Sequence, residues 1–154
     1  MSKIREDIMS VIKNNYTSII KTSLCINSNK GPCSSEEISK MLSVNCTESR
    51  KKEDFPKCSI DAGVAHNEWI YEIVYEETDK TGLIQYEIDK LEMIFGGKIK
   101  EIKEICQKYD AEVLVNISVY ENELDDVFLG LTRNNLRFLN EINAEINLAV
   151  NNIE

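Results

Sequence analysis

The stretch that most constrains the fold is residues 83–120, where an amphipathic helical pattern runs directly into an apolar strand pattern. Apolar residues recur at steps of three and four from position 84 to position 109, which predicts helix with one buried face. Gly96-Gly97 interrupts the pattern, and a helical glycine costs about 1 kcal/mol relative to alanine. We therefore expect two helices with left-handed backbone geometry at the glycines between them. Residues 112–120, rich in β-branched side chains, follow as a strand.

The rest of the chain adds further helices and strands. Helical spacing and capping residues, Ser34 or Ser35 and Thr132, predict helices over 2–13, 34–43 and 132–142. Alternating side chains predict strands over 16–27, 69–75, 127–129 and 144–150, the last with Ile146 and Leu148 pointing inward. Residues 45–65 form the least regular segment, for which we expect a surface loop with a short strand around Cys58-Ser59-Ile60.

This order of elements predicts the fold class. Helices interspersed with strands indicate an α+β fold, a two-layer sandwich with a mainly antiparallel sheet and helices packed on one face. We expect an N-terminal helical extension over residues 1–15 and a single α+β domain over residues 16–154.

The charge and the cysteines narrow the classes of partner and compartment. Lys and Arg number 18 against 27 Asp and Glu, a net charge of −9, which disfavours nucleic-acid binding. No apolar run reaches the length of a membrane-spanning helix, and the first ten residues lack the apolar core of a signal peptide. The five cysteines are odd in number, which favours reduced thiols in the cytoplasm.

Several segments together resemble a bacterial family known as domain of unknown function 4279. They are the acidic-capped helix Ser34-Ser-Glu-Glu-Ile-Ser-Lys-Met-Leu42, the basic motif Arg50-Lys51-Lys52-Glu53-Asp54, the strand Trp69-Ile-Tyr-Glu-Ile-Val, the strand over 113–120, and the closing helix and strand from Leu136. The chain departs from the family at Lys52-Glu53, where a glycine is expected, and at Asn147-Leu-Ala-Val150. The resemblance spans residues 17–150 and implies a fold without an assigned activity.

A local basic cluster, Arg50, Lys51 and Lys52, is one candidate binding site, with the sole histidine, His66, further along the same segment. It is either a solvated loop or a site for an anion or an acidic peptide. A thiolate–imidazole pair of His66 with Cys46 or Cys58 is chemically conceivable. Successive cysteines from 25 to 58 are separated by 7, 12 and 11 residues, whereas structural zinc sites use close pairs. We expect no metal and no cofactor.

An acidic run, Glu121, Glu123, Asp125 and Asp126, is the second candidate site. It lacks the glycine and the ligand spacing of a calcium loop. It is either a solvated turn between strands or a contact for a basic protein.

The absence of a catalytic motif favours a non-enzymatic protein-binding module in the cytoplasm. Small size and acidity suggest immunity-type binding of a basic partner. The alternative is a small enzyme or ligand-binding protein that uses residues 45–66, and a homo-oligomeric scaffold assembled through an exposed sheet edge is the third hypothesis.

Overall fold

The computed structural model of the protein describes residues 19–28, 34–73, 84–121 and 129–152. The helix expected over residues 2–13 lies outside these ranges, as do Glu123, Asp125 and Asp126 of the acidic run.

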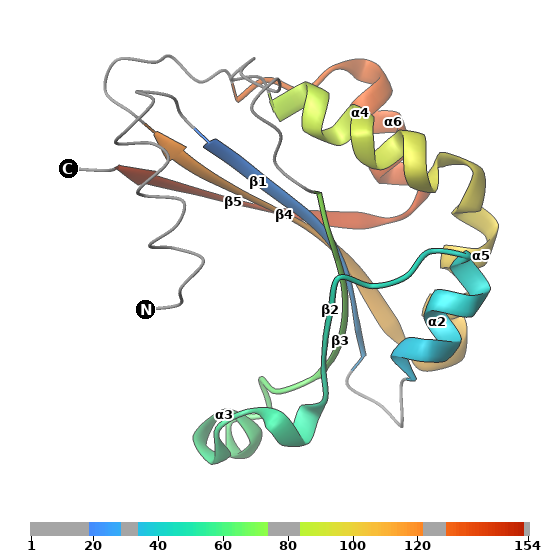
Figure 1. Ribbon diagram of the computed structural model, residues 1–154, viewed down its shortest axis with the longest axis vertical. Helices are drawn as coiled ribbons and strands as arrows, with labels where there is room; N and C mark the ends of the chain where they lie inside the picture. The colour runs from blue at the N-terminus through green and yellow to red at the C-terminus, as the bar shows by residue number, and fades with distance from the viewer. Residues whose placement is uncertain (1–18, 29–33, 74–83, 122–128, 153–154) are drawn as a thin grey trace.

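A five-stranded sheet forms the centre of the fold (Figure 1). Its strands are β1 (Ile19–Ser28), β2 (Glu48–Arg50), β3 (Asn67–Glu72), β4 (Ala111–Glu121) and β5 (Ala144–Asn152), in the order β2-β3-β1-β4-β5. All neighbouring pairs are antiparallel except β4 and β5, which are parallel. A parallel pair needs a crossover connection, and the segment between β4 and β5 carries helix α6 (Arg133–Glu141). The predicted α+β class with a mainly antiparallel sheet is confirmed.

Local capping signals start two of the helices where the sequence predicts. The hydroxyl of Ser34 accepts a hydrogen bond from the backbone N–H of Glu37 at 3.2 Å and begins α2 (Ser35–Leu42). Thr132 and Asn135 form a reciprocal capping box at the start of α6, with N···O distances of 3.0 and 3.1 Å. Both predicted caps are confirmed.

The predicted break at Gly96-Gly97 is present, but the prediction of left-handed backbone geometry at the glycines is wrong. Helices α4 (Ile84–Phe95) and α5 (Ile99–Tyr109) are joined by a 3₁₀ turn, Gly96–Lys98, and neither glycine has a positive φ. The 3₁₀ turn changes the direction of the chain by tightening a right-handed helix, so no left-handed residue is needed. A Cβ on Gly96 would lie 3.3 Å from Cγ of Glu92, so the missing side chain relieves a close approach within the turn.

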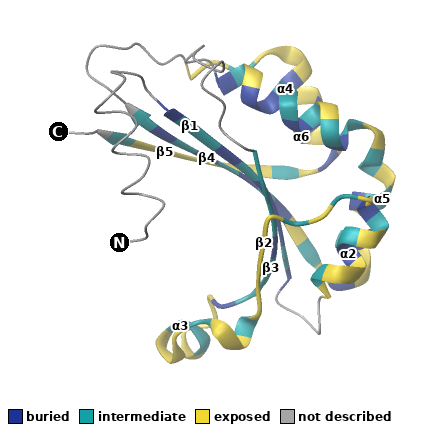
Figure 2. Ribbon diagram, in the orientation of Figure 1, coloured by how far each residue is buried: buried dark blue, intermediate teal, exposed yellow. Residues whose placement is uncertain are grey.

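Helices α2, α4, α5 and α6 lie on one side of the sheet, and the residues of the hydrophobic core lie between these helices and the sheet (Figure 2). Trp69 is fully buried there, with its ring centroid 6.2 Å from that of Phe95 in an edge-to-face arrangement. From β4 this core takes Val113, Val115, Ile117 and Val119.

Residues 51–66 connect β2 to β3 and extend from the lower end of the sheet (Figure 1). This segment is called the excursion. The strand expected around Cys58-Ser59-Ile60 is wrong, because these residues belong to the short helix α3 (Lys57–Asp61). Pro56 stands immediately before this helix, where its missing N–H costs nothing.

The last strand is present, but its predicted burial is wrong. Ile146 and Leu148 share the helix-covered side of the sheet with Val115 and Ile117, yet their exposed fractions are 38% and 44%. They remain exposed because β5 is an edge strand and the core reaches only its first residue, Ala144.

Candidate functional site

The side of the sheet opposite α2, α4, α5 and α6 is called the open face here. Residues directly opposite one another on neighbouring strands point to the same face, so the register assigns its members. They are Ile19, Lys21, Ser23, Cys25 and Asn27 of β1, Glu48 and Arg50 of β2, Glu68, Ile70 and Glu72 of β3, Glu112, Leu114, Asn116, Ser118 and Tyr120 of β4, and Glu145, Asn147, Ala149 and Asn151 of β5.

The open face is acidic. Among its described residues, the carboxylates are Glu48, Glu68, Glu72, Glu112 and Glu145, and the permanent cations are Lys21 and Arg50. Lys21 pairs with Glu72 at 3.1 Å, and Arg50 lies 3.0 Å from Glu48 and 3.8 Å from Glu68. These ion pairs neutralise much of the charge on β2 and β3.

Glu112 and Glu145 are the carboxylates of this face that take part in none of these ion pairs. Both are exposed, and no ion pair links either of them to a basic side chain of the described ranges. Both line a cleft of about 330 Å³, together with Lys103 and Cys106 of α5. Burial raises the pKa of the Cys106 thiol to about 11, which keeps this sulfur protonated and weakly nucleophilic near neutral pH.

The structure brings two of the predicted basic residues together at one carboxylate. His66 Nε2 lies 2.9 Å from Oε1 of Glu68, whose other oxygen is 3.8 Å from Arg50 Nε. His66 Nδ1 lies 3.0 Å from the carbonyl oxygen of Val64, and its ring contacts Phe55 at a centroid distance of 5.6 Å. Both polar partners of the ring are acceptors, so it donates to both only when both nitrogens carry protons.

The other two residues of the basic cluster, Lys51 and Lys52, lie at the start of the excursion. The backbone N–H of Lys51 donates to Oδ2 of Asp54 at 3.1 Å, and that of Lys52 donates to Oδ1 of Asn67 at 2.9 Å. These bonds anchor the start of the excursion and leave the Lys51 side chain exposed. Glu121 is the last residue of β4, and it is the one member of the predicted acidic run within the described ranges.

A polar network crosses the centre of the open face, and the sequence patterns did not single it out. Asn116 donates from Nδ2 to Sγ of Cys25 at 3.3 Å and accepts at Oδ1 from Nδ2 of Asn147 at 3.1 Å. Burial raises the pKa of the Cys25 thiol. The strand periodicity of each segment was visible in the sequence, but the register that joins residues 91 positions apart was not.

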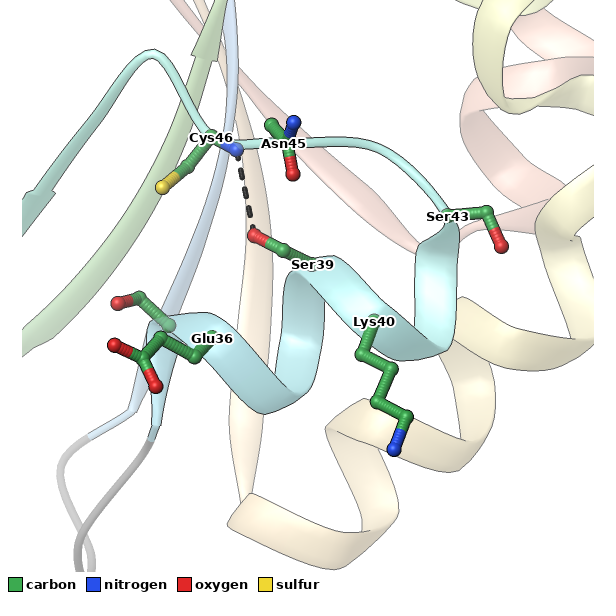
Figure 3. A pocket seen from close by; sticks show the side chains of 7 residues that line it. Glu36, Ser39, Lys40, Ser43, Asn45 and Cys46 are labelled. Atoms are coloured by element: carbon green, nitrogen blue, oxygen red, sulfur yellow. Dashed lines mark hydrogen bonds between the residues drawn. The ribbon is translucent and has the colours of Figure 1, made fainter.

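A second concave site lies between α2 and residues 43–46 (Figure 3). Its volume is about 640 Å³, and its lining includes Ser39, Lys40 and Cys46. The Ser39 hydroxyl accepts from Nε1 of Trp69 at 2.9 Å and from the backbone N–H of Cys46 at 3.4 Å, which ties α2 to β3 and to the wall of the cavity. Of the predicted ligand-binding segment 45–66, the described lining includes Asn45 and Cys46, whereas His66 and Cys58 belong to the excursion.

Comparison with known families decides the classification. A family model described as domain of unknown function DUF4279 matches residues 10–152. The chain belongs to this family. The resemblance inferred from the sequence motifs is therefore confirmed, and the DUF4279 match includes the whole sheet. No curated protein and no solved structure matches the chain.

Within the four described ranges, no helix is both long and apolar enough to cross a membrane. The same ranges contain no group of three or more His, Cys, Asp or Glu side chains arranged to hold a metal ion.

Proposed function

We propose that this DUF4279 protein is a non-enzymatic binding module that holds a basic protein partner on its open face. The observation that carries the proposal is the charge of that face, where the carboxylates of Glu112 and Glu145 have no cationic partner in the described part of the chain. Unpaired carboxylates on a broad strand surface attract Lys and Arg side chains, and Arg can bind a carboxylate through two parallel hydrogen bonds.

The charge of the whole chain adds to this argument. A net charge of −9 also accelerates encounter with a basic protein, most strongly at low salt.

Small size and acidity favour immunity-type binding. In this form of the proposal the partner is a basic toxin that the module neutralises. Cys25, Cys46, Cys58 and Cys106 are free thiols, which supports a reducing, cytoplasmic location.

The test compares two variants with the same change in net charge. Glu112→Gln with Glu145→Gln removes two negative charges from the open face, whereas Glu104→Gln with Glu141→Gln removes two exposed charges from the helices. Affinity capture from the source cells with the wild type identifies the partner, and titration calorimetry at low salt measures its affinity for all three proteins.

We expect the open-face variant to bind roughly 10-fold more weakly, since two surface ion pairs contribute up to about 1 kcal/mol each. The helix variant should bind nearly as the wild type does. Equal losses in the two variants would mean that net charge alone attracts the partner, and no specific basic protein in the capture would remove the basis of the proposal.

One observation favours a second candidate function, the binding of a small polar molecule. The cavity between α2 and residues 43–46 is lined by serine hydroxyls, the Asn45 amide, the Cys46 thiol and the charged Glu36 and Lys40. A thermal-shift screen of small polar metabolites tests it. A ligand of this cavity should raise the Tm of the wild type and leave that of Asn45→Ala unchanged, whereas a screen without any stabilising compound counts against this function.

A further inference from the structure

β5 is an exposed edge strand with an apolar stripe. It pairs with β4 on one side, and no other described strand pairs with its outer edge. On its helix-side face, Ile146, Leu148 and Val150 are 38%, 44% and 50% exposed. The stripe continues the core-facing row of β4 beyond the area that the helices cover.

This edge lacks the features that protect edge strands from pairing. Proteins usually shield such edges with lysine, proline, a bulge or a very short strand. β5 is 9 residues long, AEINLAVNN, with no lysine and no proline, and Glu145 is its single charge. Its pairing with β4 runs without interruption from Ala144 to Asn152.

We propose that β5 pairs antiparallel with β5 of a second copy of this chain, about a two-fold axis through Leu148. Leu148 is the central residue of the strand, so this register pairs all nine residues of each copy. On the helix side, Leu148 meets its own counterpart and Ile146 meets Val150. On the open face, Asn147 meets Ala149 and Glu145 meets Asn151. The strand is thus complementary to itself, which is what an isologous interface requires.

The charges fit this register. Each Glu145 lies opposite the neutral Asn151, and the two Glu145 residues are six positions apart along the ladder, roughly 20 Å at 3.3 Å per residue. That separation exceeds the Debye length of about 8 Å at physiological ionic strength. Each chain carries a net charge of −9, so two copies repel each other, and added salt should strengthen the dimer by screening this repulsion. A complex with a basic partner responds to salt in the opposite direction.

The geometry also explains the exposed stripe. A two-fold axis perpendicular to the sheet keeps the helices of both copies on the same face, so the two stripes lie side by side between the two α6 helices. Cross-strand pairs of aliphatic side chains then bury the surface that a single copy exposes.

The first experiment is sedimentation equilibrium over a concentration series. The wild type should reach twice the 17.7 kDa chain mass, with tighter association at high salt. Leu148→Lys places two like charges on the axis and should sediment as a monomer. Met93→Lys makes the same change at a residue of α4 that is 86% exposed, and it should remain dimeric. Circular dichroism checks that both variants are folded.

The second experiment tests the register by oxidative cross-linking in a Cys58→Ser background, which removes an exposed native thiol. Residues directly opposite in an antiparallel pair have Cα atoms about 4.5–5.5 Å apart, within disulfide range. Leu148→Cys should therefore cross-link two copies, whereas Val150→Cys, about 13 Å from its counterpart in this register, should not.

A wild type that remains monomeric at its highest soluble concentration overturns the proposal. A dimer that persists in Leu148→Lys also overturns it, because another surface then joins the copies. Cross-linking by Val150→Cys without cross-linking by Leu148→Cys contradicts the proposed register.

Discussion

The hydrogen bond between Trp69 and Ser39 gives the sharpest test of how the fold is held together. Trp69 lies on β3 with an exposed fraction of 0%, and its Nε1–H donates to the Ser39 hydroxyl of α2 at 2.9 Å. Ser39→Ala removes the acceptor and leaves an indole N–H inside the protein. The cost of an unsatisfied buried donor is about 1–3 kcal/mol. Ser39 also borders an open cavity from which water can approach, so we expect the lower part of this range, about 1 kcal/mol.

A double-mutant cycle separates this bond from the packing of the ring. Trp69→Phe removes both the donor and part of the ring volume, and it should cost about 2 kcal/mol. In that background no indole N–H remains, so Ser39→Ala should cost about 1 kcal/mol less than it does in the wild type. The Cys46 N–H···Ser39 bond is lost equally in both backgrounds and cancels from the cycle.

Urea unfolding measures the four free energies. Trp69 is the sole tryptophan, so its fluorescence reports unfolding of the two proteins that retain it, and far-UV circular dichroism reports all four. Because m scales with exposed surface, the four m values should agree. Additive effects, with coupling below about 0.3 kcal/mol, would refute the reasoning that this bond joins α2 to the sheet.

Four further predictions concern individual residues. Gly63→Ala should cost at least about 1 kcal/mol in urea unfolding, because φ is +71° at Gly63, whereas Gly97→Ala should be neutral or slightly stabilising, since no atom crowds its Cβ position. Asn135→Ala should cost about 2–3 kcal/mol, because this buried side-chain amide accepts from the backbone N–H of Thr132 at the start of α6 and donates to the Asp89 carboxylate of α4 at 2.7 Å; a cost below about 0.5 kcal/mol contradicts this account. Peptide mapping after iodoacetamide treatment at pH 8 should find Cys58 labelled well before Cys106, whose pKa burial raises to about 11. The folded-state pKa of Cys106 lies above the ordinary 9.0, so the raised pKa contributes to the free energy of unfolding below pH 9, and this contribution is lost as the pH rises through 11. In Cys106→Ala this pH dependence should be absent.

Local signals predicted much of the secondary structure. Ser34 and Thr132 mark the starts of α2 and α6 because a side-chain oxygen that satisfies an orphan amide acts within one helical turn. The helices on either side of Gly96-Gly97 were predictable because their apolar faces keep a regular period.

The sequence did not predict features that depend on which segments meet. Cys58-Ser59-Ile60 is too short to carry a clear period, so its helical state was missed. Ile146 and Leu148 were predicted to be buried because the alternation of side chains along a strand shows which face they share, but not whether other residues cover that face. Arg50 and His66 both contact Glu68 because β2 pairs with β3, and the sequence does not show this pairing. The signal that could have indicated a charged face is the alternation of Glu48 with Arg50 and of Glu68 with Glu72.

The most direct test of the open face as a binding surface is carboxylate footprinting. Carbodiimide coupling of glycine ethyl ester, read by mass spectrometry, reports the accessibility of each carboxylate with and without the captured partner. On the open face, Glu112 and Glu145 should lose reactivity in the complex, while Glu104 and Glu141, which are exposed on α5 and α6, should keep it. Loss of reactivity at Glu104 and Glu141, with Glu112 and Glu145 unchanged, would place the partner on the helices and contradict the account.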